Sequence, residues 1–183
     1  MTTNAKNAES RNAITHRIKM KILVCCLALT LASPIAYTKK VDAKAQDMRC
    51  MQANIFFEAR GESRLGKLAV AKVTTNRKDS KQYPNSVCKV VFQPWQFSWT
   101  KQLSWKRIQQ VMDGSTKGMK AKDRLALKEA QELAWTALEG PVTILPSSVL
   151  HYHALSVQPY WAKKMQKHKV IGQHVFYKQK GKK

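Results

Sequence analysis

The chain has 183 residues, of which 44% are hydrophobic, and it carries a formal net charge of +22. A chain of this length can bury one core of ordinary size, which excludes two independent large cores and predicts a single folded domain. A surface this basic favours a polyanionic partner, such as nucleic acid, an anionic lipid surface or a bacterial envelope.

The N-terminal stretch has the layout of an export signal, in which basic residues precede an apolar run at 22–37 and then small residues. The basic residues are Arg11, Arg17, Lys19 and Lys21. The run is shorter than the span of about 20 residues that a membrane helix needs. We therefore expect residues 1–45 to be a cleaved signal peptide with a basic extension, with a retained N-terminal anchor and a buried core helix as alternatives. Ala36 and Ala45 are candidate cleavage points.

Positive charge also dominates the chain after this segment. From Gln46 onward it holds 25 Lys and Arg side chains against 9 Asp and Glu, a surplus of 16. The basicity therefore belongs to the expected domain at 46–178 and to a short basic tail at 179–183. Because export removes a protein from nucleic acid, we expect the partner to be an anionic envelope surface. We also expect a monomer.

Two cysteines remain outside the apolar run, which itself contains Cys25 and Cys26. In an exported domain, Cys50 and Cys88 favour a disulfide over a metal site, which would need more ligands at shorter spacing. Such a bridge would stabilise the fold by roughly 3–4 kcal/mol on the loop-entropy estimate. Two buried free thiols are the alternative.

Two helices are predicted to meet at an acidic corner. Apolar residues recur at helical spacing over 47–60, namely Met48, Met51, Ile55, Phe56 and Ala59. Gly61 suits the end of this helix, and Ser63 can cap a second helix that runs to about Arg77. The corner between them carries Glu58 and Glu62.

The middle of the chain combines a short apolar segment, an aromatic loop and a long helix. Residues 86–92 suit either a helical turn or a strand. The rings that follow either line a sugar-binding cleft or belong to the core: Trp95, Phe97, Trp99 and Trp105. Residues 123–138 form the clearest helix of the chain, ended by Gly140, with its glutamates on a solvated face.

The C-terminal part changes to short aromatic-rich segments. Residues 149–154 (VLHYHA) and 174–178 (HVFYK) suggest a small hairpin or irregular strands, and the last residues suggest a frayed basic tail. The predicted fold class is therefore mainly α, of the α+β type, with a small β element near the C-terminus.

Glu58 has the setting of a general acid. It lies on the last turn of an apolar helix, beside Phe56 and Phe57, and partial desolvation there would raise its pKa toward neutrality. Cleavage of a glycosidic bond needs such an acid to protonate the leaving oxygen. Glu62 follows a glycine, so we expect it to be more exposed; ordinary surface ion pairing is the alternative for both glutamates.

Five segments, in order over about residues 50–177, resemble the motifs of the cell-wall hydrolase family that includes the spore-cortex-lytic enzymes. They are NIFFEARGESRLGKLAVAKVTTNR, YPNSVCKVVFQ, QFSW, LHYHALSVQPYW and IGQHVFY. The resemblance implies a lysozyme-like, mainly helical domain that acts on peptidoglycan glycan strands, with Glu58 as the catalytic acid. It also implies that Glu62 completes the catalytic corner.

We expect a set of substrate-binding residues, of which Asn76, Gln96, Phe97, Ser98 and Trp99 match motifs of the family. They are Arg60, Asn76, Gln96, Phe97, Ser98, Trp99, His151, Tyr152, His153, Tyr160 and Trp161. Relatives often continue QFSW with a Cys-Asp-Gly run, whereas this chain has Thr100-Lys101-Gln102. Any function tied to that cysteine is therefore absent here, and core packing is the alternative role for Tyr152, Tyr160 and Trp161.

The number of catalytic carboxyl groups decides the reaction class. A two-carboxylate glycosidase needs a second acid near the first, and no acid in the front half sits in a setting as apolar as that of Glu58. A lytic transglycosylase needs only one, because the 6-hydroxyl of muramic acid attacks the anomeric carbon. We therefore expect lytic transglycosylase chemistry at the MurNAc–GlcNAc bond, with a hydrolytic muramidase as the alternative.

Two other function classes remain open. His151, His153 and His174 could be drawn as the zinc ligands of an amidase, but no carboxylate or cysteine accompanies them at metal spacing, so we expect no metal and no cofactor. A non-catalytic basic protein that binds an anionic envelope polymer or nucleic acid is the other alternative.

Overall fold

The computed structural model describes residues 34–179, with side chains from Asp42 onward. Residue contacts divide the chain into Met1–Asp42 and Ala43–Lys183, and the second unit carries the features below. Residues 1–33 of the predicted export segment, and 180–183 of the predicted tail, lie outside the described residues. Among the helices of residues 34–179, none combines the length and the apolar character that crossing a membrane requires.

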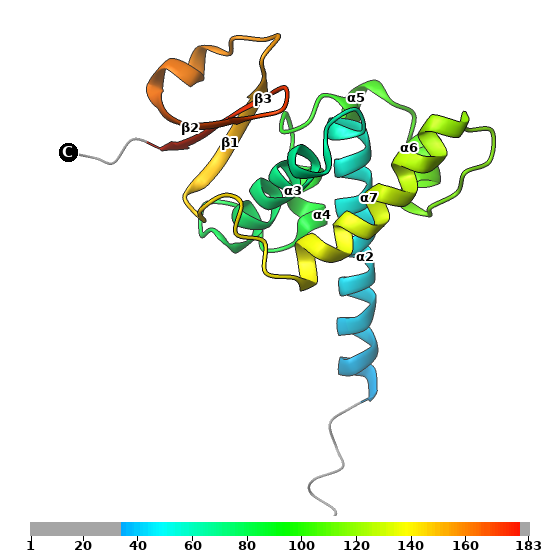
Figure 1. Ribbon diagram of the computed structural model, residues 1–183. Coiled ribbons are helices and arrows are strands. Elements are labelled where there is room, and N and C mark those ends of the chain that lie inside the picture. The colour runs from blue at the N-terminus through cyan, green and yellow to red at the C-terminus, as the bar shows by residue number, and fades with distance from the viewer. Residues whose placement is uncertain (1–33, 180–183) are drawn as a thin grey trace, which may run out of the picture. The chain divides into compact units, whose positions relative to one another are not determined.

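The described chain is mainly helical with one small sheet, which confirms the predicted α+β class (Figure 1). The helices are α2 (Pro34–Ala59), α3 (Arg64–Asp79), α4 (Val87–Val91), α5 (Trp99–Gln102), α6 (Trp105–Met112), α7 (Ala121–Glu139) and the 3-10 helix η1 (Tyr160–Lys164). The strands are β1 (Val149–Ala154), β2 (Met165–Ile171) and β3 (His174–Gln179).

The sheet is antiparallel in the order β1-β3-β2, so the tight hairpin joins β2 to β3. The two segments predicted as strands, β1 and β3, pair directly with each other, and β2 pairs with the other edge of β3. Strand β2 was not predicted, because it is an edge strand whose central side chains are exposed and largely polar, without apolar alternation. Gln179, the first residue of the predicted tail, belongs to β3.

The acidic corner forms as the sequence predicts. Helix α2 ends at Ala59, whose carbonyl accepts a hydrogen bond from the Glu62 N–H at 2.9 Å. Ser63 caps α3, since its hydroxyl accepts from the Gly66 N–H at 3.2 Å. The corner therefore holds Glu58 and Glu62 on the two sides of a defined turn.

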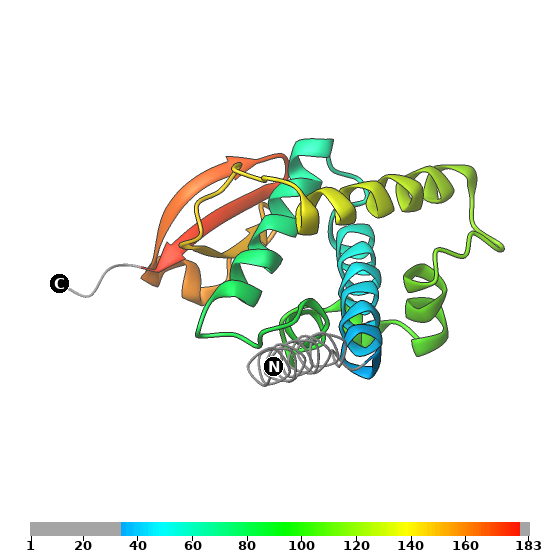
Figure 2. The ribbon, with the colours of Figure 1, turned by 90° about the horizontal axis from the view of Figure 1, so that it is seen from below.

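Helix α3 lies between the sheet and α7 and separates two parts of the core (Figure 2). One part is helical and centres on Met51, Ile55 and Phe56 of α2. The other lies between α3 and the sheet and includes Val70, Val73 and Phe176. This arrangement brings the end of α2 and the face of β1 to the same region.

The aromatic loop divides between core and surface. Phe97 and Trp99 are buried in the helical core, whereas Trp95 is 83% exposed and Trp105 is 56% exposed. Trp105 begins α6, which was not predicted although Ser104 caps it and its apolar residues follow helical spacing. This short helix was not predicted because its first residue, Trp105, was assigned to the aromatic loop.

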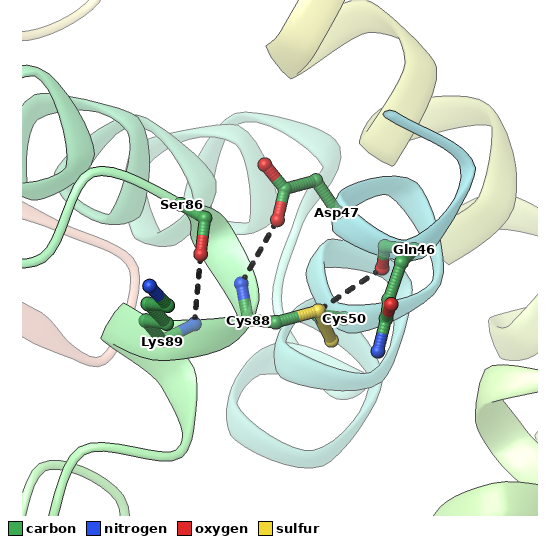
Figure 3. Close-up of a disulfide and its surroundings, with 6 residues drawn as sticks. All are labelled: Gln46, Asp47, Cys50, Ser86, Cys88 and Lys89. Carbon is green, nitrogen blue, oxygen red and sulfur yellow. Dashed lines mark hydrogen bonds between the residues drawn. A yellow bond between two sulfur atoms is a disulfide. The ribbon is translucent and has the colours of Figure 1, made fainter. Parts of the chain in front are cut away.

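Cys50 and Cys88 form a disulfide, which confirms the predicted pairing over two free thiols (Figure 3). The bridge joins α2 to α4, and its Cα atoms lie 5.2 Å apart. The Cys88 N–H donates to Oδ1 of Asp47 at 3.1 Å, and Ser86 accepts from the Lys89 N–H at 3.3 Å. The segment 86–92 is thus a capped helical turn rather than a strand.

One glutamate of α7 is not on a solvated face, contrary to the prediction. Glu129 accepts from Nζ of Lys67 at 2.5 Å, and the Lys67 side chain is only 7% exposed. A buried ammonium needs an anionic partner. Glu129 therefore neutralises a buried charge of α3 and joins α3 to α7.

Candidate active site

A pocket of about 230 Å³ contains Glu58 and gathers residues that are far apart in the sequence. They come from the end of α2, from α3, from the loop before α5, from β1 and the residues after it, and from β3. The lining residues are Phe57, Glu58, Arg77, Gln96, Phe97, Tyr152, His153, Ala154, Val157 and His174. Glu58 is the only carboxylate among these described lining residues.

Glu58 is partly buried and accepts a hydrogen bond from one protein side chain. The Tyr152 hydroxyl donates to Oε2 of Glu58 at 3.1 Å. Burial raises the pKa of Glu58 above its ordinary value, while the Tyr152 hydrogen bond and the Arg77 charge partly oppose that rise. The result is a carboxyl group that keeps its proton to higher pH than an exposed glutamate.

Tyr152 is fixed by aromatic packing beneath the pocket. Its ring meets the His174 ring edge-on at 5.3 Å and lies 5.7 Å from the Phe176 ring. Burial and the nearby Glu58 carboxylate raise the pKa of Tyr152 well above its ordinary value. Tyr152 therefore keeps its proton and acts as a hydrogen-bond donor to Glu58.

Arg77 places a buried cation in the pocket wall. Its Nε donates to the Leu150 carbonyl at 2.7 Å, and its guanidinium lies over the rings of Tyr83 and Phe97. Its Nη1 is buried and has no hydrogen-bond partner within residues 34–179. A buried donor without a partner is costly, and the Arg77 cation adds positive charge to the pocket wall.

Glu62 is not exposed, contrary to the prediction, because its side chain is only 10% accessible. Both of its carboxylate oxygens lie 3.2 Å from the Gln173 N–H, and Oε1 lies 3.5 Å from Nδ1 of His174. A Cβ at Gly172 would overlap this carboxylate. Glu62 therefore joins the corner to the β2–β3 turn and does not line the Glu58 pocket.

His153 forms one wall of the pocket in a defined tautomer. Its Nδ1 lies 2.9 Å from the Ala154 carbonyl, which can only accept, so Nδ1 carries the hydrogen. Its Nε2 then accepts from the Tyr177 hydroxyl at 2.9 Å, and the two rings stack. The His153 ring is thus fixed by bonds at both nitrogens.

His151 and His174 are held by the fold rather than by a metal arrangement. Nε2 of His151 lies 3.3 Å from the Tyr83 hydroxyl, and burial with the Arg77 charge lowers the pKa of His151 to about 4. Burial also lowers the pKa of His174, against the opposing Glu62 carboxylate. Within residues 34–179, no three His, Cys, Asp or Glu side chains gather as metal ligands.

Several predicted binding residues lie outside the Glu58 pocket. Asn76 is buried and donates to the carbonyls of Pro146 and Val149, so its amide fixes the start of β1. Arg60 points to Asp123 at 3.9 Å, across the Phe56 ring. Ser98 is exposed, and Trp99 is in the core.

The remaining aromatic residues lie beside the pocket. Tyr160 is 80% exposed and lines a second, adjoining pocket. Trp161 packs against the rings of His151, His153 and Tyr177. Sequence reasoning missed Val157 as a wall of the Glu58 pocket, and its place in an irregular segment after β1 gave no periodic signal.

Comparisons with known proteins agree with the motifs. Residues 61–177, starting just after Glu58, match the family described as Cell Wall Hydrolase. The spore cortex-lytic enzyme of Bacillus subtilis (strain 168) is 42% identical over 52 residues, which are 28% of this chain and 17% of that enzyme. The enzyme of Bacillus cereus is also 42% identical over 52 residues, 20% of its length. The match thus spans about a fifth of these relatives.

Two solved structures are similar to the chain. The catalytic domain of the germination-specific lytic transglycosylase SleB from Bacillus anthracis is 27% identical, with 73% of this chain and 94% of that domain covered and a TM-score of 0.45. The catalytic domain of Bacillus cereus SleB is 28% identical, with 73% and 91% covered and a TM-score of 0.43. Because the family match covers more than half of the sequence, the chain belongs to the Cell Wall Hydrolase family.

Proposed function

We propose that this chain cleaves the MurNAc–GlcNAc bond of peptidoglycan as a lytic transglycosylase, with Glu58 as its only catalytic carboxyl group. The observation that carries the proposal is the environment of Glu58. It is the single carboxylate among the described residues that line the pocket, and burial raises its pKa. Membership of the Cell Wall Hydrolase family supports the same substrate.

The proposed reaction moves one proton out of Glu58 and returns one. Glu58 donates its proton to the oxygen that leaves with N-acetylglucosamine, while positive charge develops at C1 of muramic acid. The muramic acid 6-hydroxyl then bonds to C1, and the Glu58 carboxylate accepts the proton of that hydroxyl. The product is a 1,6-anhydro sugar, no water is consumed, and Glu58 ends protonated as it began.

The other polar groups of the pocket orient Glu58 and the sugar. The Tyr152 hydrogen bond stabilises the ionised form of Glu58, which exists between the two proton transfers. The side chain of Gln96 can donate to sugar oxygens, and the Arg77 cation lies in the pocket wall. The fixed ring of His153 limits where the sugar can lie.

A two-carboxylate muramidase has less support. Glu62 is the nearest candidate in the sequence, but its oxygens are taken by the Gln173 N–H and face the β2–β3 turn. Such a hydrolase needs a second carboxylate within about 5–9.5 Å of the acid to act as nucleophile or to activate water. The described lining of the pocket offers none.

We also propose that the protein works outside the cytoplasm as a monomer. The export-like segment at 1–45 and the surplus of 16 positive charges from Gln46 onward support binding to an anionic envelope rather than to nucleic acid. An anchor at 22–37 is compatible with the same site of action.

Product analysis tests the proposal. The full chain is incubated with purified peptidoglycan sacculi, and soluble products are identified by mass spectrometry. We expect 1,6-anhydro-muramyl products that are absent with Glu58→Gln and present with Glu132→Gln, a matched change at a 54% exposed side chain. Reducing-end sugars would show a muramidase, and freed peptides that disappear with a chelator would show a zinc amidase. The absence of any product would favour the alternative of a non-catalytic binding protein.

A further inference from the structure

A second pocket of about 670 Å³ adjoins the Glu58 pocket. The two share His153 and Val157 as lining residues. The second pocket is lined by residues of β1, β2, β3 and η1 and of the segment between β1 and η1. Its lining residues are His153, Leu155, Val157, Gln158, Pro159, Tyr160, Ala162, Lys163, Met165, Lys167, Val175 and Tyr177.

The lining of this second pocket is apolar and basic, and it contains no Asp or Glu among the described residues. Lys163 and Lys167 are both exposed, one on η1 and one on β2. Apolar side chains beside them are also uncovered: Leu155 is 47% exposed, Val157 51% and Tyr160 80%. Its chemistry suits an anionic ligand with small apolar groups.

The partition between the two pockets is rigid. The His153 ring is bonded at both nitrogens, stacks on Tyr177 and meets Trp161 edge-on. A sugar beside Glu58 would therefore meet the second pocket at a fixed place. Because the two pockets share His153 and Val157, a substituent on that sugar would lie next to the second pocket.

We propose that this second pocket binds the peptide stem of the muramic acid whose bond Glu58 cleaves, an inference that rests on the proposed function. The stem is attached through the lactyl group at O3 of the same ring whose C1 reacts, so it leaves the sugar next to the acid. It carries free carboxylates, which suit Lys163 and Lys167, and alanine methyl groups, which suit the uncovered apolar side chains. The chain should therefore prefer peptide-bearing strands to bare ones.

An anionic lipid headgroup would also match the two lysines. It gives no reason for the pocket to share a wall with the Glu58 pocket, whereas a stem on the reacting sugar does. The continuity of the two pockets therefore favours the stem, and lipid binding becomes one outcome of the test.

Binding to two matched polymers tests the inference without relying on catalysis. One polymer is a preparation of uncross-linked glycan strands that keep their peptide stems, and the other is the same preparation stripped by an amidase. Glu58→Gln protein, as the full chain, is titrated with each. The pocket variant adds Lys163→Gln and Lys167→Gln, and the control variant adds Lys122→Gln and Lys128→Gln, two exposed lysines of α7.

We expect tighter binding to stem-bearing strands, a loss of roughly fivefold in the pocket variant, and no such loss on stripped strands, because each exposed ion pair contributes modestly. The control variant should keep the preference. Equal affinity for both polymers, or equal losses in both lysine variants, would overturn the inference. Phosphatidylglycerol vesicles are titrated in the same way. A loss of affinity in the pocket variant that is confined to these vesicles would also overturn the inference and would reassign the pocket to lipid.

Cleavage by the wild-type chain separates this inference from the proposed function. If anhydro products form equally fast from both polymers, the proposed function stands and the stem inference fails. If binding prefers the stems and no strand is cleaved, the pocket assignment stands and the assigned chemistry fails.

Discussion

Glu58 and Glu62 lie on either side of Gly61, yet the fold treats them in opposite ways. Glu58 faces a pocket with one hydrogen-bond donor from the protein and a raised pKa. Glu62 faces the β2–β3 turn, where the Gln173 N–H and His174 contact its oxygens. One carboxyl group is left available for a substrate, and the other is used to hold the structure.

One short motif can thus contribute to both stability and chemistry. A carboxylate whose oxygens accept from a backbone N–H stabilises the fold. A carboxyl group desolvated in a pocket lowers stability when it ionises and is a good donor. The two residues should therefore separate cleanly when each is changed.

The largest effect should come from Glu58→Gln, which removes the proton and keeps the shape. We expect cleavage to fall by roughly 10²–10⁴-fold, the usual contribution of a general acid. Release of soluble muropeptides from sacculi measures this, with Glu132→Gln as the control. Substantial activity in the Glu58→Gln protein would remove Glu58 from the mechanism.

The same variant should not lose stability, which sharpens the contrast with Glu62. Because the pKa of Glu58 is raised in the folded state, its stabilising contribution is present below pH 4.5 and is lost as pH rises through the raised pKa. The melting temperature of Glu58→Gln relative to the wild type should therefore increase from acid to neutral pH. A constant difference across that range would contradict the raised pKa.

Loss of the disulfide shows how far the free energy of unfolding falls when a contact outside the acidic corner is removed. Cys50→Ala with Cys88→Ala should lower the free energy of unfolding by roughly 3–4 kcal/mol, because the unfolded chain regains the entropy of an open loop. Chemical denaturation measures this. Cleavage per folded molecule should change little, since neither cysteine lines the Glu58 pocket.

Glu62→Gln should act on stability more than on cleavage. The amide cannot replace both carboxylate oxygens near the Gln173 N–H, so we expect a loss of roughly 1–3 kcal/mol in unfolding free energy. Cleavage at a temperature where the variant is folded should fall far less than in Glu58→Gln. Equal losses of cleavage in the two variants would mean that Glu62 takes part in the reaction.

Gly172→Ala tests the same contact from the side of the turn. Gly172 has φ of 55°, and a Cβ there would overlap the Glu62 carboxylate. We expect a loss of roughly 1–2 kcal/mol from the left-handed backbone alone, and a further loss from displacing Glu62. In a Glu62→Ala background the loss caused by displacing Glu62 should vanish. A double-mutant cycle measures that difference.

Tyr152→Phe should have the smallest effect, and a diagnostic one. Its hydroxyl stabilises the ionised form of Glu58, so its removal raises the pKa of Glu58 further. The alkaline limb of the pH–rate profile should move to higher pH, while the rate below that limb falls less than roughly tenfold. A limb that moves to lower pH would mean that the bond stabilises protonated Glu58 instead.

Much of the helical frame could be predicted from the sequence, because its signals are local. The apolar stripe of α2, the Ser63 cap and the long periodic helix α7 depend on residues close in the chain. The Cys50–Cys88 bridge was predictable because few cysteines remained to pair. Strand β2 was not, since an edge strand with exposed charged side chains lacks an apolar period.

The site was predictable only in part. Local apolar context predicted Glu58 as the candidate acid, and the structure places it in a pocket, but its contact with Tyr152 spans 94 positions and depends on the packing of β1. The family resemblance named Asn76 as a binding residue, whereas its amide is used by two carbonyls at the start of β1. Glu62 was expected to be exposed because a glycine precedes it, and only the β2–β3 turn buries it.

The proposed role of Glu58 as a general acid depends on a pKa that burial raises above its ordinary value. A carbon NMR titration of the Glu58 side-chain carboxyl, assigned by comparison with Glu58→Gln, tests it directly. We predict a midpoint above the ordinary value of 4.5 that coincides with the alkaline limb of cleavage. A midpoint at or below 4.5, or one unrelated to that limb, would contradict the assignment of Glu58 as the general acid.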